Sequence, residues 1–191
     1  MSIQPALLDL LAPKSIAGLN YIEDYITASQ ETALIDSIDQ YPWSLELLRR
    51  RQWYGHAYDD ATGYVAQPMP AWLTQVAQAL YADGHLDGVA DRALVNEYTP
   101  GQGIGAHRDR DIDHIKAVGI ISLGSGAAMD FTRLGHETYT RYLHPRSLTI
   151  MRGEARQLWM HGITGRKSDR LGGLVLPRQR RLSLTFRYAN P

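Results

Sequence analysis

The segment AVGIISLGSGAAMDFTRLGHETYTRYLHPRSLTIMR, residues 117–152, decides the fold class, because short β-prone runs follow one another in it with turn residues between them. The same pattern begins near residue 92 and continues to about residue 188. We expect strands at ALVNEY, AVGIISL, AAMDFT, TYTRYL, SLTIM and RLSLTFRY. Strands do not alternate regularly with helices here, which favours an antiparallel sheet or sandwich.

Two helices are expected upstream of these strands. Thr27 or Ser29 can cap a helix over about residues 30–40, and a second helix covers about residues 70–82. The second helix carries an apolar stripe of Trp72, Val76 and Leu80. Two helices followed by many short strands predict an α+β domain: a double-stranded β-helix, or jelly roll, with the N-terminal helices packed on one face.

Composition limits the class of protein. The 191 residues fit a single domain, 1–191, and the absence of cysteine excludes thiolate zinc sites and iron–sulfur clusters. The 20 basic and 20 acidic residues balance, so a broad basic surface is not expected, although Arg49, Arg50 and Arg51 are consecutive. No segment approaches the roughly 20 apolar residues of a membrane span. We expect a soluble, cytoplasmic protein without membrane contact or an obligate protein partner.

A candidate metal site begins in the segment IGAHRD, residues 104–109. In an extended chain residues i and i+2 point to the same face, so His107 and Asp109 can converge on one ion. His161, in the segment LWMHGI, can supply a third ligand. Two histidines and one carboxylate form the facial triad of non-haem iron(II) oxygenases, which leaves half of the coordination sphere open. The alternative is that a histidine in such a loop is simply a solvated surface residue. We expect this of the remaining five histidines, His56, His85, His114, His136 and His144.

Alternation in the last strand places Arg181, Ser183, Thr185 and Arg187 on one face. Leu94, Asn96 and Tyr98 share a face of the strand before the metal segment in the same way. These faces are either exposed to water or enclosed beside the metal. A buried dicarboxylate would need a guanidinium at each end. Six residues of strand span about 20 Å, however, so both arginines reach one five-carbon diacid only if their side chains lean inward or the strand coils.

Four segments in this order resemble the AlkB family of Fe(II)/2-oxoglutarate-dependent dioxygenases. They are NEYTPGQGIGAHRD, ISLGSGAAMDF, PRSLTIMRGEARQLWMHGIT and RLSLTFR, and the likeness extends over about residues 19–188. In motif detail the chain is more similar to the animal homologue that hydroxylates a modified wobble uridine in transfer RNA than to the repair enzyme. It carries no RNA-recognition or methyltransferase segment, so that homologue's whole function is not expected here.

The resemblance implies a jelly-roll oxygenase that uses Fe(II), 2-oxoglutarate as cosubstrate and O2. By matching position, it implies that the catalytic iron ligands are His107, Asp109 and His161. It implies 2-oxoglutarate contacts from Asn96, Tyr98, Arg181 and Arg187. Ser183 departs from the pattern, because the repair enzyme has an amide side chain there.

Upstream, the segment RRRQWYGHAYDDATG resembles the family's nucleotide-recognition lid, which we place at about residues 49–70, before a catalytic jelly roll at about residues 92–188. Tyr54 and Tyr58, with Trp53, are the candidates to stack on a flipped base, and Asp111 matches a position that can touch it. An ordinary aromatic packing cluster is the alternative for the lid.

These features lead to one main hypothesis and two alternatives. The main one is hydroxylation of an alkylated or otherwise modified base in DNA or RNA, by oxidative dealkylation or transfer-RNA modification, with single-stranded nucleic acid as the partner. The second is a protein or small-molecule hydroxylase with the same iron site. The third is a non-catalytic binding module, which the intact triad disfavours.

Overall fold

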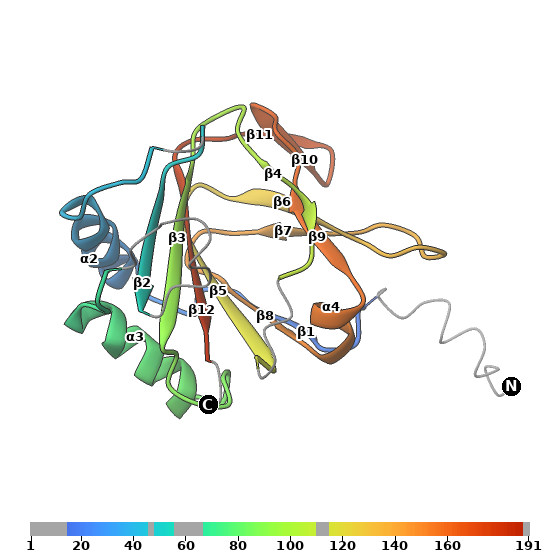
Figure 1. The fold of residues 1–191 in the computed structure, drawn as a ribbon. Coiled ribbons are helices and arrows are strands. Elements are labelled where there is room, and N and C mark those ends of the chain that lie inside the picture. The colour runs from blue at the N-terminus through green and yellow to red at the C-terminus, as the bar shows by residue number, and fades with distance from the viewer. Residues whose placement is uncertain (1–14, 46–47, 56–66, 110–114, 189–191) are drawn as a thin grey trace, which may run out of the picture.

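The computed structural model describes residues 15–45, 48–55, 67–109 and 115–188, and its strands form a sandwich of two antiparallel sheets (Figure 1). The six-stranded major sheet has the order β1 (Leu19–Ile22), β8 (Leu148–Arg152), β5 (Ala117–Gly124), β12 (Arg181–Arg187), β3 (Arg92–Tyr98) and β2 (Arg51–Gly55). The four-stranded minor sheet has the order β4 (Ile104–His107), β9 (Met160–Ile163), β6 (Ala127–Thr132) and β7 (Tyr139–Leu143). Strands β10 (Ser168–Leu171) and β11 (Leu174–Pro177) form a separate hairpin.

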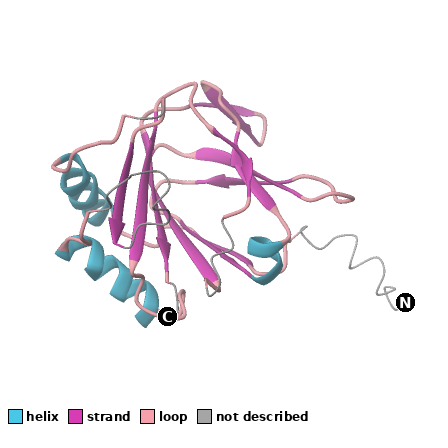
Figure 2. Ribbon diagram, in the orientation of Figure 1, coloured by secondary structure: helices cyan, strands magenta, loops and turns pink. Residues whose placement is uncertain are grey.

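Helices α2 (Ala28–Asp39) and α3 (Ala71–Ala82) cover the outer face of the major sheet, and the short helix α4 (Gly153–Gln157) follows β8 (Figure 2). Helix α2 begins with a capping box, in which the Thr27 hydroxyl accepts from the Gln30 backbone N–H and the Gln30 side chain accepts from the Thr27 N–H. The face of α3 that is fully buried consists of Leu73, Ala77 and Leu80. Trp72 and Val76 of the expected stripe are only partly buried against this core.

Alternation along β12 separates two cores. Leu182, Leu184 and Phe186 pack under the helices, whereas the opposite face of the strand looks into the space between the sheets. That second core includes Met129, Phe131 and other apolar residues of the minor sheet. Of the polar residues on this face, Asn96, Arg181, Ser183 and Thr185 are buried and Arg187 is partly buried, so the enclosed polar face considered for these strands is the one observed.

The α+β jelly roll with N-terminal helices on one face is confirmed. Each expected strand lies within a residue or two of an observed one, and both helices were placed correctly. The strands β1, β2, β4, β9, β10 and β11 were not among those expected. In the part of the chain that the structure describes, no helix is long and apolar enough to cross a membrane.

Candidate active site

His107, Asp109 and His161 come together between the two sheets. His107 ends β4 and lies opposite His161 of β9, so that their ring centroids are 4.5 Å apart. One ligand atom from each of the three side chains lies within 4.8 Å of the others. The structure therefore brings together the three residues that the sequence singled out as metal ligands.

Strand β4 does not reach this arrangement as a simple extended strand. Its pairing with β9 shifts register between Ile104 and His107, and the strand ends at His107, before Asp109. A bulge of this kind re-aims side chains beside a site. Close approach of the two strands depends on Gly162, because a Cβ atom there would lie 2.9 Å from the backbone nitrogen of Ala106.

Asp109 is held from the other sheet by Arg187, whose guanidinium donates to Asp109 Oδ1. Burial raises the pKa of Asp109, but the attraction of the Arg187 guanidinium outweighs the effect of burial and the pKa lies below the ordinary value. Asp109 is therefore a carboxylate, the form that binds a cation.

The histidines are suited to ligation. His107 Nδ1 lies 3.0 Å from the Gly105 carbonyl oxygen, which only accepts, so the proton belongs on Nδ1 and the lone pair on Nε2 is free. Burial lowers the pKa of His161 to about 4, which keeps its ring neutral. Within the described residues, Asp109 Oδ2 and His161 Nδ1 are buried polar atoms without a hydrogen-bond partner. This donor set fits an iron(II) ion.

Arg181, at the other end of β12, is a buried cation that lacks a carboxylate. It is 3% exposed, and its Nη2 donates to Ser122 Oγ at 3.0 Å, while Nε and Nη1 have no partner among the described residues. Burial lowers its pKa, which reflects the cost of enclosing an unpaired guanidinium. A dicarboxylate such as 2-oxoglutarate fits this arginine.

The Arg181 side chain lies toward Arg187, which shortens the distance between the two guanidinium groups. Ser122, which binds Arg181, is the cross-strand neighbour of Ser183, two residues along β12 toward Arg187. Arg181 thus leans inward, as one cosubstrate bound at both ends requires. Asn96 and Tyr98 face the same space from β3, where they pair with Ser183 and Arg181.

Arg49 borders the space between the sheets that holds Arg181, and sequence reasoning did not assign it there. Its Nε donates to Asn96 Oδ1 at 2.9 Å, and its Cζ lies 5.4 Å from the centroid of the Tyr98 ring. The arginine run 49–51 is not a free cationic patch, since Arg50 donates to Glu97 and Arg51 lies over Trp53. No pattern in the sequence distinguishes the inward arginine from its neighbours.

The prediction that Tyr54 stacks on a base is wrong. Tyr54 is 1% exposed, its hydroxyl donates to Gln52 Oε1 at 3.0 Å, and its ring packs on Tyr41 and Trp72 in the helix-side core. Period-two alternation in β2 is the reason, because it sends Tyr54 to the helices and Trp53, opposite Leu94, to the face that carries Asn96. Tyr58 and Asp111 lie outside the described residues.

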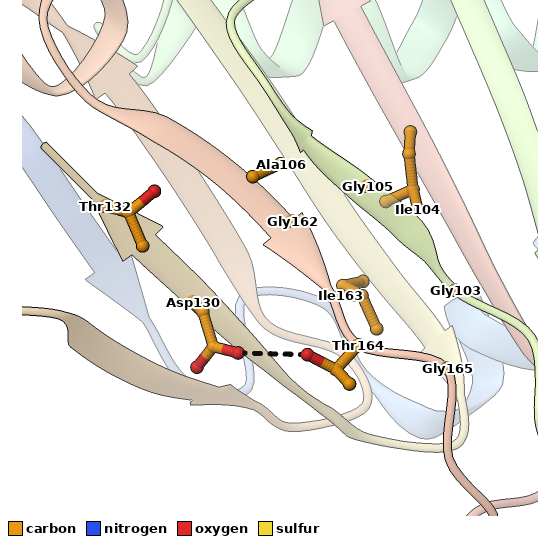
Figure 3. Close-up of a pocket in the computed structure, with 10 residues that line it drawn as sticks. All are labelled: Gly103, Ile104, Gly105, Ala106, Asp130, Thr132, Gly162, Ile163, Thr164 and Gly165. Atoms are coloured by element: carbon orange, nitrogen blue, oxygen red, sulfur yellow. Dashed lines mark hydrogen bonds between the residues drawn. The ribbon is translucent and has the colours of Figure 1, made fainter.

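A pocket of about 390 Å³ lies on the outer face of the minor sheet (Figure 3). Glycines of β4 and β9 line it with Asp130, Thr132 and Thr164, and the Thr164 hydroxyl donates to Asp130 at 3.3 Å. Asp130 and Gly162 are cross-strand partners, whereas the neighbouring His161 and Phe131 face the opposite side. The pocket is therefore behind the metal ligands and separate from the space that holds Arg181.

The chain matches the model of the 2OG-Fe(II) oxygenase superfamily over residues 18–187. The probable RNA/DNA demethylase ALKBH6 of Danio rerio is 30% identical over 198 aligned residues, covering 88% of this chain and 84% of that protein. The tRNA (carboxymethyluridine(34)-5-O)-methyltransferase alkbh8 of Xenopus tropicalis is 34% identical over 84% of this chain, which spans only 27% of that protein. The solved structure of OsALKBH1 superimposes with a TM-score of 0.68 at 19% identity, over 90% of this chain and 98% of the other, and shows the fold alone.

Proposed function

Since the chain belongs to the AlkB family of the 2OG-Fe(II) oxygenase superfamily, we propose that it hydroxylates carbon attached to a base of DNA or RNA. It is a dioxygenase that uses iron(II), 2-oxoglutarate and O2. The observation that carries the proposal is the convergence of His107, Asp109 and His161 within 4.8 Å, in a chain whose relative from Danio rerio is named as a probable RNA/DNA demethylase.

Each residue of the site has a distinct task in such a reaction. When bound, iron(II) with 2-oxoglutarate and O2 supplies an oxidant that hydroxylates a C–H bond while the keto acid is decarboxylated. His107, Asp109 and His161 would hold the ion on one side and leave its other positions open. Arg187 keeps Asp109 ionised and oriented. Arg181, which is buried, would pair with the distal carboxylate of 2-oxoglutarate.

The test is a panel assay of 2-oxoglutarate turnover with methylated single-stranded DNA, methylated RNA, transfer RNA and no added substrate. We expect one of the nucleic acids to stimulate turnover. His107→Ala should abolish that stimulation while the variant keeps its fold, and His136→Ala, at an exposed histidine, is the matched control. Stimulation by peptides or metabolites alone would show that the protein is a hydroxylase of another class.

A further inference from the structure

Arg49 links the segment before β2 to two of the proposed 2-oxoglutarate contacts. Besides its 2.9 Å hydrogen bond to Asn96 Oδ1 and its position over Tyr98, it donates through Nη1 to the Gly103 carbonyl at 3.3 Å. The Arg181 guanidinium is also near that ring, with Cζ 5.3 Å from the Tyr98 centroid. Arg49 thus borders the same end of the space between the sheets as Arg181.

The hydrogen bond from Arg49 determines which way the Asn96 amide is turned. A guanidinium has only donors, so it binds the amide oxygen and cannot bind the amide nitrogen. With Oδ1 held by Arg49, the two N–H groups on Nδ2 are the part of Asn96 that remains for a ligand. Those groups are donors, which is what a carboxylate requires.

Asn96 is well placed for this task. It is 5% exposed and is the cross-strand partner of Ser183, which pairs in turn with Ser122, the residue that binds Arg181. Asn96 and the Ser122 hydroxyl that binds Arg181 therefore belong to one row of cross-strand partners, Asn96, Ser183 and Ser122. A turned amide would instead present its oxygen to the cosubstrate carboxylate, and two acceptors repel each other.

We propose that Arg49 is a positioning residue for 2-oxoglutarate, which acts by fixing the Asn96 amide with its N–H donors toward the cosubstrate. The proposal rests on the 2-oxoglutarate contacts assigned above. It gives Arg49 a role in cosubstrate affinity that is separate from metal binding, because Arg49 contacts none of the three ligands in the described structure.

The test measures 2-oxoglutarate binding to the full Mn(II)-loaded chain by calorimetry. Arg49→Met keeps the aliphatic stem but removes every donor, and we expect the dissociation constant to rise about tenfold, as for loss of a hydrogen bond to a charged group. Affinity for Mn(II) should not change. Arg49→Lys, which can still donate to Asn96, should recover part of the loss.

A double-mutant cycle with Asn96→Ala separates positioning from a direct charge effect. If Arg49 acts through the amide, Arg49→Met has no further effect in the Asn96→Ala background. The matched control is Gln102→Ala, which removes the 2.8 Å hydrogen bond from Gln102 Nε2 to the Leu48 carbonyl and so loosens the same segment without touching Asn96. It also removes the 2.9 Å hydrogen bond that Gln102 Oε1 accepts from the Thr99 N–H. It should bind 2-oxoglutarate like the unmodified protein.

Four results would overturn the proposal. An unchanged affinity in Arg49→Met, with normal binding by the unmodified protein, contradicts the role of Arg49 alone. If Arg49→Met lowers the affinity for 2-oxoglutarate equally in the Asn96→Ala background, Arg49 acts on the cosubstrate through its charge. If Gln102→Ala lowers the affinity equally, the effect of Arg49→Met comes from loosening the segment before β2. Absence of 2-oxoglutarate binding by the unmodified protein contradicts the cosubstrate site itself.

Discussion

At the scale of single residues, the two arginines of β12 differ in what they bind, although they share one strand. Arg187 has a carboxylate within the protein, because it pairs with Asp109 across the gap between the sheets. Among the described residues, Arg181 donates to the Ser122 hydroxyl and lies beside the Tyr98 ring, and no carboxylate is hydrogen-bonded to it. Alternation in the sequence placed both on one face, but only the fold reveals that one of them is neutralised internally. Arg181 is therefore the arginine that needs an external anion.

Arg181→Lys tests this assignment. Lysine keeps the charge but loses the planar fork of donors, so we expect the concentration of 2-oxoglutarate needed for half-maximal turnover to rise by about tenfold or more. The nucleic-acid concentration needed should change little. Steady-state kinetics with each substrate varied in turn measures both, and equal effects on the two substrates would contradict the role.

His161 makes the stability of the metal-free protein depend on pH. Its pKa is lowered by burial to about 4 in the folded chain, against 6.5 for an exposed histidine. Between these values the unfolded chain binds the additional proton, so stability falls as pH decreases from 6.5 toward 4. The lowered pKa of Asp109 acts only below its ordinary value of 3.8, outside this window.

Urea unfolding of chelator-treated protein at about pH 7 and about pH 5 measures the effect, which we expect to be about 2 kcal/mol at a slope of 1.36 kcal/mol per pKa unit. Glutamine does not bind a proton in this pH range. In His161→Gln the free energy of unfolding should therefore differ less between the two pH values, by about the same amount. An unchanged pH dependence in the variant would rule out His161 as its source.

Trp53 and Tyr54 are adjacent in sequence but are expected to give opposite phenotypes. Tyr54→Ala should destabilise the fold by about 3–5 kcal/mol, since it empties a position that is 1% exposed in the helix-side core. Trp53→Ala should leave stability nearly unchanged and weaken single-stranded nucleic-acid binding by about tenfold, the effect of losing one stacked base. Chemical denaturation and fluorescence anisotropy distinguish the two, and a reversal of these phenotypes would restore Tyr54 as the stacking residue.

At the scale of secondary-structure elements, the metal site depends on how closely β4 and β9 approach. A Cβ atom at Gly103 would lie 2.1 Å from the Ile163 carbonyl oxygen, and one at Gly162 would lie 2.9 Å from the Ala106 nitrogen. Both contacts involve backbone, which cannot move aside independently of its strand. The glycines therefore permit the bulge that directs His107 toward His161.

Gly162→Ala should consequently weaken Mn(II) binding by about tenfold or more, because β4 must shift to admit the methyl group. Gly105→Ala is the matched control on the facing strand, where an added Cβ meets no atom within 4 Å. Calorimetric titration of both variants with Mn(II) checks the effect. Equal affinities in the two variants would show that the strand contact does not set the ligand geometry.

Some elements could be predicted from sequence, and others depend on distant partners. Helix α2 has a local signal in its capping box, and β12 has strict alternation. Strand β2 gains its structure from pairing with β3, and β1 from pairing with β8, so their sequences carry little signal of their own. The metal triad was found because a family motif marks it, whereas Arg49 was not, since its partner Asn96 is 47 residues away.

At the scale of the whole molecule, the position of the iron ligands between two sheets restricts the substrate. A base stacked inside a duplex cannot enter this space, and extruding it costs a few kcal/mol unless the strand is already open. We expect single-stranded DNA or RNA to bind at least about tenfold more tightly than the same sequence in a duplex. Competition binding measures this preference, and tighter duplex binding would contradict it.

Salt dependence adds a second check on the mode of binding. Because basic and acidic residues balance, and because Arg49 and Arg50 are bound to Asn96 and Glu97, we expect few phosphate contacts. The logarithm of the affinity should fall with the logarithm of salt concentration at a slope that reflects only a few contacts.

Strand β12 is the last strand of the sandwich along the chain, yet it lies between β3 and β5 in the interior of the major sheet. During synthesis, β3 and β5 emerge from the ribosome long before β12, the strand that pairs with both. Until then, the edge of each strand that pairs with β12 has no partner. The sandwich cannot close, and Asp109 cannot be secured by Arg187, until residues 181–187 have been made. We therefore expect iron loading to follow translation of the domain, and we expect a nascent chain that stalls before residue 181 to expose an aggregation-prone half sheet.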